Sequence, residues 1–272
     1  IVAEILKMPP DAITVIAADT DCTPFEQATG GSRTTHRAGH SVRIAAEDAL
    51  DKLLSLAAEK LEAAKDDLDL HSGRVFIKGT PERCLDLASL ASASLTSRKG
   101  PIIGVGVKGR EEMLAAEAQA GRVVDSGVYG THAVQVEVDP ETGLVKVLKY
   151  FAAHDVGFAF NPANVRGQIE GGVAFGIGYA LSEELILRRG EVQNPNFLDY
   201  KLPTIMNVPK IDSAIVEVPA RYGPYGAKGV GEPTVVPVAP AIASAICDAI
   251  GVRITDLPIT PEKIFQALHK SE

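Results

Sequence analysis

A single carboxylate, Glu232, lies in a glycine-rich segment near the end of the sequence, Gly226–Pro233 (G-A-K-G-V-G-E-P). Glycine carries no Cβ, so the glycines of this segment let the backbone bend and approach a bulky group closely. Pro233 disfavours the α region at Glu232 and predicts an extended backbone there. Lys228 is the other charge of the segment, and an apolar stretch follows. These surroundings predict a desolvated carboxylate suited to general-base work; the alternative is a surface turn with a solvated glutamate.

A second segment, Thr29–Thr35 (T-G-G-S-R-T-T), precedes a long predicted helix. Backbone N–H groups and the helix dipole at such a terminus favour a phosphate, and Arg33 can add a charge-assisted hydrogen bond. A plain helix-capping loop is an equal alternative. The spacing of a Walker A loop is absent, so an ATP-binding protein ranks last among the functional hypotheses.

The third segment, Asn161–Gly178, places five glycines in a stretch with helical character. A glycine inside a helix costs about 1 kcal/mol relative to alanine. Helices keep such glycines where another backbone or a flat ligand approaches closely. Gln168, which can donate and accept hydrogen bonds, lies among them. The alternative is tight helix packing with Gln168 on the surface.

The elements that must position these segments mix helices and strands without a regular alternation, which predicts an α+β fold. Residues 132–139 and 144–151 alternate in polarity around D-P-E-T-G and predict a hairpin. The predicted helices are Ile1–Lys7, Gly39–Ala64, Pro81–Ala91, Asn164–Leu187 and Pro237–Ile250, the last ending at Gly251. The other predicted strands are Ala12–Ala18, which we expect to be buried, Val75–Lys78, Ile102–Val107 and Asp212–Val218.

Composition excludes several classes of protein. The 272 residues carry a net charge of −8, which disfavours nucleic acid or an anionic membrane as the main partner. The three cysteines, Cys22, Cys84 and Cys247, form no C-x-x-C pair, so we expect no structural zinc and no iron–sulfur cluster on this chain. We find no apolar run of membrane-spanning length and no signal peptide, which predicts a cytoplasmic protein. The sequence opens without Met, so we expect it to be part of something longer.

Taken together, the sequence resembles the C-terminal portion of the molybdenum-binding large subunit of the xanthine dehydrogenase (molybdenum hydroxylase) family. The resemblance extends from about Ile1 to Ile264. Each motif is weak alone, and their occurrence in this order is specific. The segments that carry it are A-D-T-D-C-T-P, A-T-G-G-S-R-T-T, V-E-V-D-P-E-T-G, A-A-H-D-V-G-F-A-F-N-P, G-Q-I-E-G-G-V-A-F-G-I-G-Y-A-L-S-E-E, G-A-K-G-V-G-E-P and I-T-D-L-P-I-T-P-E-K-I.

The resemblance implies a role for each segment. Glu232 corresponds to the base at molybdenum, and Gln168 to a hydrogen-bonding partner of the pterin or of a molybdenum oxo group. The pterin dithiolene holds the molybdenum, so no side chain is expected to ligate it. The family's cofactor is molybdopterin, in bacteria usually the cytosine dinucleotide form. The other cofactor-binding residues implied are Gly31, Ser32, Arg33 and Thr34 on the phosphates or pterin, and Gly229, Val230 and Gly231 against the metal's ligand sphere.

The implied reaction is hydroxylation of an electron-poor carbon, in an aldehyde or an aromatic N-heterocycle, with water as the oxygen source. FAD and two [2Fe-2S] clusters are expected on partner chains. The family's N-terminal half carries a Gly-Gly-x-Phe-Gly loop that is missing here, so this chain should hold only part of the site. We expect one cofactor-binding region over residues 1–272, with α+β subdomains at about 1–125 and 126–272. The alternative function is a non-catalytic structural or assembly module.

Other residues receive structural interpretations. The pair His154–Asp155 is expected to support the fold, next to rather than in the site. Tyr222 and Tyr225 precede the Glu232 segment and are candidates for the substrate entrance, although packing is the favoured interpretation. The six histidines show no spacing typical of a metal site.

Overall fold

The computed structural model describes residues 1–26, 29–97, 100–107 and 127–269. The chain divides into two compact units, Ile1–Asp125 and Ser126–Glu272, and each has its own hydrophobic core. Helices and mixed sheets occur in the chain, and the prediction of an α+β fold is confirmed.

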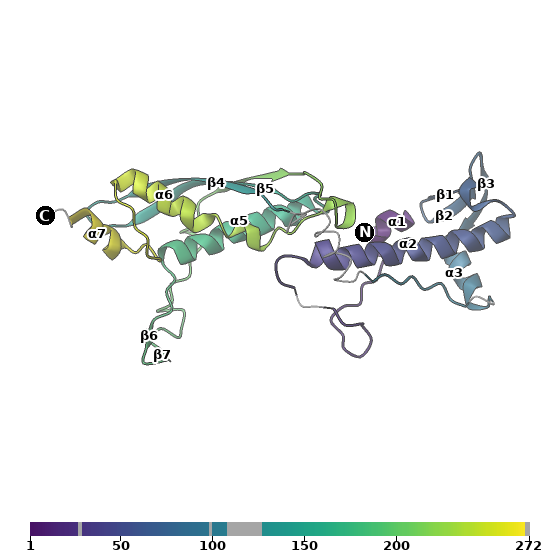
Figure 1. The fold of residues 1–272 in the computed structure, drawn as a ribbon, viewed down its shortest axis with the longest axis horizontal. Helices are drawn as coiled ribbons and strands as arrows, with labels where there is room; N and C mark the ends of the chain where they lie inside the picture. Colours follow the sequence, from purple (N-terminus) through teal and green to yellow (C-terminus); the bar gives the residue numbers. More distant parts are fainter. Residues whose placement is uncertain (27–28, 98–99, 108–126, 270–272) are drawn as a thin grey trace, which may run out of the picture. The chain divides into compact units, whose positions relative to one another are not determined.

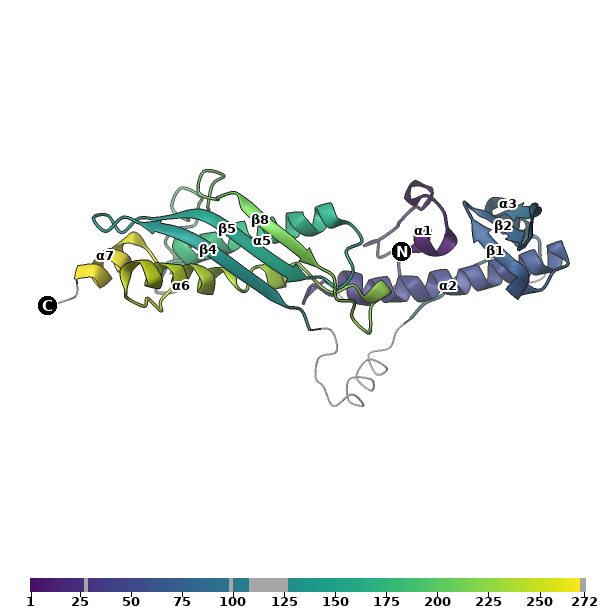
Figure 2. The same ribbon diagram turned by 90° about the horizontal axis from the view of Figure 1, so that it is seen from above.

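The first unit is built on one long helix, α2 (Thr34–Leu61), visible in Figure 2 beside a small antiparallel sheet. The sheet has the order β1-β2-β3, and its buried side chains meet those of α2 and α3. Its elements are α1 (Val2–Leu6), η1 (Pro10–Ala12), η2 (Lys65–Asp67), β1 (Leu68–His71), β2 (Arg74–Ile77), β3 (Thr80–Asp86) and α3 (Leu87–Leu95).

In this unit one predicted helix is largely a strand, and one strand was not predicted. Residues 81–91 do not form one helix: Pro81 is the second residue of β3, and α3 begins only at Leu87. β3 is an edge strand, where a proline removes no hydrogen bond that the sheet needs. The strand β1 was missed altogether.

The predicted strands 12–18 and 102–107 are also wrong. Val15 and Ile16 are 80% and 68% exposed, so the first segment is neither a strand nor buried. The second runs along α2 instead of pairing with a strand: Lys52 Nζ donates to the carbonyl of Ile103 at 2.8 Å, and the amide of Val105 donates to Asp48. Side chains of a helix therefore satisfy backbone groups that a sheet would otherwise satisfy.

The second unit contains a three-stranded sheet of order β4-β5-β8, with β4 (Gly130–Val138) antiparallel to β5 (Val145–Asp155) and β8 (Ile211–Val216) parallel to it. The predicted hairpin is confirmed: the Asp139 carboxylate accepts from Glu141 N and Thr142 Oγ1 in the connecting turn. Helix α5 (Pro162–Leu181) lies in the crossover between β5 and β8. Helices α6 (Val238–Ile250) and α7 (Pro261–His269) complete the unit, with a short hairpin of β6 (Leu187–Arg188) and β7 (Glu191–Val192).

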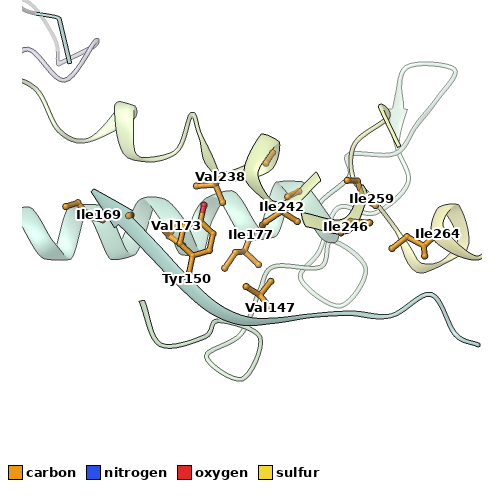
Figure 3. Close-up of a cluster of buried hydrophobic side chains, with 13 residues drawn as sticks. Val147, Tyr150, Ile169, Val173, Ile177, Val238, Ile242, Ile246, Ile259 and Ile264 are labelled. Atoms are coloured by element: carbon orange, nitrogen blue, oxygen red, sulfur yellow. The ribbon is translucent and has the colours of Figure 1, made fainter. Parts of the chain in front are cut away.

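Helices α5 and α6 cover the same face of this sheet (Figure 1). Side chains of β5 meet those of both helices in the core of Figure 3. The segment Glu232–Ile250 is long and apolar enough to cross a membrane, so the prediction that no such run exists is wrong. Its helix is nevertheless part of a protein core, because Val238, Ile242 and Ile246 are almost completely buried against β4, β5 and α5.

Helix α5 ends six residues before its predicted end at Leu187, which lies instead in β6. The Ser182 hydroxyl, immediately after the helix, donates to the carbonyl of Lys201 at 2.8 Å, which draws the chain away from the helix axis.

A chain of three polar rings is built into the core of this unit. His132 Nδ1 lies 2.9 Å from the Tyr150 hydroxyl, and His132 Nε2 lies 2.7 Å from His154 Nε2. The short distance between the two imidazoles requires one to donate and the other to accept. Burial, and then the proximity of His154, lower the pKa of His132 from 6.5 to about 4, and burial also lowers the pKa of His154. A proton added to the nitrogen that accepts this hydrogen bond would place two N–H groups against each other.

These shifts predict loss of stability in mild acid. A histidine with a lowered pKa binds protons more readily in the unfolded chain, so its contribution is complete above pH 6.5 and declines as the pH falls towards 4. We expect the free energy of unfolding, measured in urea, to fall by about 1–2 kcal/mol between pH 7.5 and 5 on account of this pair. His132→Gln should reduce this pH dependence, whereas His71→Gln, at an exposed histidine, should leave it unchanged. A His132→Gln chain with the full wild-type pH dependence would contradict the assignment.

Candidate functional site

Glu232 opens a short 3-10 turn, η4 (Glu232–Thr234), and is exposed, so the desolvated carboxylate predicted from the sequence is wrong for this chain. The turn is closed by the amide of Val235, which donates to the Glu232 carbonyl at 3.0 Å. The extended backbone predicted at Glu232 is therefore wrong, since turn hydrogen bonds outweigh the bias that Pro233 imposes.

Thr234 joins this turn to helix α5. Its hydroxyl lies 2.7 Å from the carbonyl of Gly231 and 3.3 Å from that of Gln168, and the residue is completely buried. The structure thereby brings two of the predicted site residues, Gln168 and Glu232, to either side of one threonine. Sequence reasoning missed Thr234, although a threonine two residues after the carboxylate is a visible signal for a turn that bonds to its own backbone.

The five glycines of α5 fall into two groups. A Cβ on Gly172 would lie 2.0 Å from Thr234 Oγ1, and a Cβ on Gly176 would lie 2.4 Å from Val238, so these glycines allow α5 to approach η4 and α6. Gly178 is similarly crowded by Glu183 and Pro203. Gly167 and Gly171, by contrast, have open space where a Cβ would be, and both flank the exposed Gln168. The helix therefore presents a bare surface around Gln168.

Lys228 of the same glycine-rich segment is buried and forms an ion pair with Asp155, with Nζ 2.6 Å from Oδ2. Burial alone would raise the pKa of the Asp155 carboxyl, but hydrogen bonds from Lys228 and from the amides of Gly157 and Val218 outweigh it and hold the pKa below its usual value. The prediction from the sequence treated Lys228 only as a charge and missed its partner, which is 73 residues away.

Aromatic side chains gather beside this segment. Phe158, Phe160 and Tyr225 contact one another with ring centroids 5.0–5.9 Å apart, and all three are partly exposed. Tyr222 has the Arg221 guanidinium 5.6 Å from its ring centroid. Tyr225 thus packs against aromatic neighbours, as expected for the favoured interpretation of this residue.

Gly229, Val230 and Gly231 lie in the second unit, directly before Glu232, whereas the four remaining predicted site residues lie in the first unit, at the start of α2. Gly31 and Ser32 both have positive φ, 67° and 55°, so the chain turns sharply just before the helix. Arg33 is the residue preceding α2, and Thr34 is its first residue, with Oγ1 2.6 Å from Thr29 Oγ1. The predicted helix start at Gly39 is wrong by about one and a half turns, and the Thr29–Thr35 segment lies directly at the helix terminus.

In this α+β fold a glycine-rich helix, α5, packs against the turn that begins with Glu232. The molybdopterin cofactor-binding domain family matches residues 1–209, and the chain belongs to this family. This confirms the resemblance found in the sequence.

Two curated proteins are similar to this chain over nearly its whole length. The gamma subunit of the 6-hydroxypseudooxynicotine dehydrogenase complex of Paenarthrobacter nicotinovorans is 38% identical over 100% of this chain and 34% of its own length. A putative xanthine dehydrogenase molybdenum-binding subunit of Escherichia coli is 35% identical over 98% of this chain and 35% of its own length. The chain therefore spans about a third of the length of these relatives.

Among solved structures, quinoline 2-oxidoreductase from Pseudomonas putida 86 matches with a TM-score of 0.86 at 28% identity, over 99% of this chain and 34% of the other. The Cu,Mo-containing CO dehydrogenase matches with a TM-score of 0.84 at 28% identity, over 98% of this chain and 34% of the other. This chain therefore has the fold of about one third of each of these two larger chains.

The packing of α5 against η4 can be tested with two adjacent glycines. Gly172→Ala forces a methyl group onto the short, buried Thr234 side chain, and we expect it to lower the free energy of unfolding by about 1–3 kcal/mol. Gly171→Ala is the matched control, because its methyl group enters open space and should stabilise the helix by up to about 1 kcal/mol. Urea unfolding of both variants measures the difference, and equal effects would contradict the close contact.

Proposed function

We propose that this chain is the molybdenum-cofactor-binding portion of an oxidoreductase that hydroxylates an electron-poor carbon with oxygen from water. The observation that carries the proposal is that the Thr234 hydroxyl lies within hydrogen-bonding distance of the backbone carbonyls of Gln168 and of Gly231, the residue before Glu232. It places an amide and a carboxylate on two segments whose glycines leave room for a large, flat group. The membership in the molybdopterin cofactor-binding domain family supports the choice of that group.

The residues present fit a pterin cofactor. Gly167 and Gly171 leave the surface around Gln168 bare, so a planar ring can approach the helix backbone while the Gln168 amide donates and accepts hydrogen bonds. Gly229, Val230 and Gly231 would face the metal's ligands with little side-chain bulk. When bound, the cofactor supplies the redox chemistry, and the protein supplies placement and proton transfer.

Glu232 is proposed as the general base. A carboxylate at this turn would accept a proton from the attacking oxygen as the new carbon–oxygen bond forms, and would later release it to solvent. Its position between two buried residues, Lys228 and Thr234, favours a defined orientation, which general-base catalysis requires.

Gly31, Ser32, Arg33 and Thr34 are proposed to bind the phosphates or the pterin. The sharp turn before α2 leads the backbone into the first turn of a 28-residue helix, whose amides and dipole favour an anion. Arg33 would add a charge-assisted hydrogen bond to a phosphate oxygen. The cytosine dinucleotide form is the proposed cofactor.

The remaining parts of the enzyme are proposed to lie outside this sequence. They are the rest of the large subunit, an FAD-containing chain and an iron–sulfur chain, assembled in the cytoplasm. The nicotine 6-hydroxylase large subunit of Paenarthrobacter nicotinovorans is 34% identical over 98% of this chain and 33% of its own length. Its name and that of quinoline 2-oxidoreductase favour an aromatic N-heterocycle as substrate. Aldehydes and purines are the alternative substrates, which should be tested together with aromatic N-heterocycles.

The role of Glu232 is tested by Glu232→Gln in the complete complex. The amide keeps the shape of the side chain but cannot accept the proton, so we expect molybdenum content near wild type and turnover lowered by about 100-fold or more. Turnover is measured over a panel of quinoline, nicotine, xanthine and benzaldehyde. Glu191→Gln, at an exposed glutamate of the β6–β7 hairpin, is the control. Wild-type turnover in Glu232→Gln would favour the non-catalytic module instead.

The role of Arg33 is tested by Arg33→Ala. Loss of a charge-assisted hydrogen bond to phosphate should weaken cofactor binding about tenfold. Molybdenum and nucleotide are measured per chain after gel filtration of the complex. Lys60→Ala, which removes an exposed positive charge at the other end of α2, should leave both contents unchanged. Full occupancy in Arg33→Ala would remove this segment from the cofactor site.

A further inference from the structure

We propose that the buried ion pair Asp155–Lys228 is a positioning pair that fixes the backbone carrying Glu232. The inference rests on the proposed role of Glu232 and adds two residues to it. Neither side chain is proposed to touch substrate or cofactor.

Asp155 is the point where three parts of the second unit are joined. Its Oδ1 accepts hydrogen bonds from the amides of Gly157 at 3.0 Å and Val218 at 3.1 Å, and its Oδ2 accepts from Lys228 Nζ at 2.6 Å. Its own amide donates to the carbonyl of Tyr129 at 2.9 Å. One carboxylate at the end of β5 thus connects the chain after β8 to the glycine-rich segment.

Lys228 is held through its backbone as well as its side chain. Its amide donates to the carbonyl of Val156 at 2.9 Å, and its side chain is only 7% exposed. A Cβ on Gly157 would lie 2.0 Å from the carbonyl oxygen of Gly226 and 3.0 Å from Lys228 Cγ, so the two segments touch without room for a side chain. These contacts therefore fix the position of both the backbone and the side chain of Lys228.

The Glu232 segment consequently has a fixed residue on each side. Lys228 lies before it and Thr234 after it, and Gly229–Gly231 connects the lysine to Glu232. Two of these three connecting residues are glycines, which have more backbone freedom than other residues. If Lys228 were not held in place, the backbone of Gly229–Gly231 could adopt more conformations, and the position of Glu232 would vary with it.

The chemistry of the pair suits positioning better than stability. Two buried charges lose much of their attraction to desolvation, so a well-packed neutral pair is often as stable. An ion pair with fixed hydrogen bonds is directional, however, and a displacement of about 1 Å at a reacting group can lower a rate about 100-fold. The expected signature is a change in kcat without a change in fold or cofactor content.

The test is the double variant Asp155→Asn/Lys228→Met in the complete complex. The carboxamide oxygen of the introduced asparagine can still accept from the two amides, and the methionine side chain fills the space of the lysine without a charge. We expect molybdenum content and KM within about twofold of wild type, kcat per molybdenum lowered about tenfold or more, and faster amide hydrogen exchange over residues 226–234. The control is Asp212→Asn/Lys210→Met, which removes an exposed ion pair of 3.1 Å in the same unit and should change none of these.

Wild-type kcat per molybdenum, or unchanged exchange over residues 226–234, would overturn the positioning role. If the double variant does not assemble, Lys228→Gln decides, because it keeps a hydrogen-bond donor and removes the charge. We expect it to lower kcat severalfold at unchanged KM, and wild-type kcat would overturn the inference. Glu232→Gln is assayed in parallel. If Glu232→Gln is active, the proposed function is refuted. If Glu232→Gln is inactive and the double variant is fully active, only the positioning role of the Asp155–Lys228 pair is refuted.

Discussion

The organisation of the second unit depends on the close approach of helix α5 to the segment that leads into α6. Gly172 and Gly176 permit it, since any side chain at either position would overlap Thr234 or Val238. Because of this approach, the buried Thr234 hydroxyl lies within hydrogen-bonding distance of two carbonyl groups. One is that of Gly231, directly before Glu232, and the other is that of Gln168 in α5. The same contact closes the hydrophobic core, because α5 and α6 bury their apolar side chains against β5. Core packing and the candidate site therefore share one constraint.

This shared constraint explains why glycines that weaken a helix are retained in α5. A glycine in a helix costs about 0.5–1 kcal/mol, and three such positions are offset by packing that a larger residue would exclude. Gly167 and Gly171 have no such compensation, because no neighbour fills the space beside them. A contact with a group outside the described residues would offset this cost. That reasoning, together with Gln168 between the two glycines, supports a ligand on this face.

The sequence predicted elements well where local signals and tertiary contacts agree. The β4–β5 hairpin has alternating side chains and a turn whose aspartate bonds its own loop, and α6 ends at Gly251 with φ 76° as a helix followed by glycine should. The predictions failed where distant partners decide. The segment 102–107 has the composition of a strand, yet α2 supplies its hydrogen bonds. Pro81 resembles a helix start, yet it lies in an edge strand that tolerates it.

The same distinction separates the candidate site residues. Glu232, Gln168 and Arg33 were predicted from local patterns, since glycines and prolines mark unusual backbone within a few residues of each. Asp155 was predicted only to support the fold and Thr234 was not predicted at all, because their partners, Lys228 and Gln168, are 73 and 66 residues away. A reacting residue can be recognised from its side-chain chemistry and its neighbours in the sequence. Its orientation depends on contacts with residues that are distant in the sequence. The residues that orient a site are therefore the part that sequence patterns reveal least, and a structure is needed to find them.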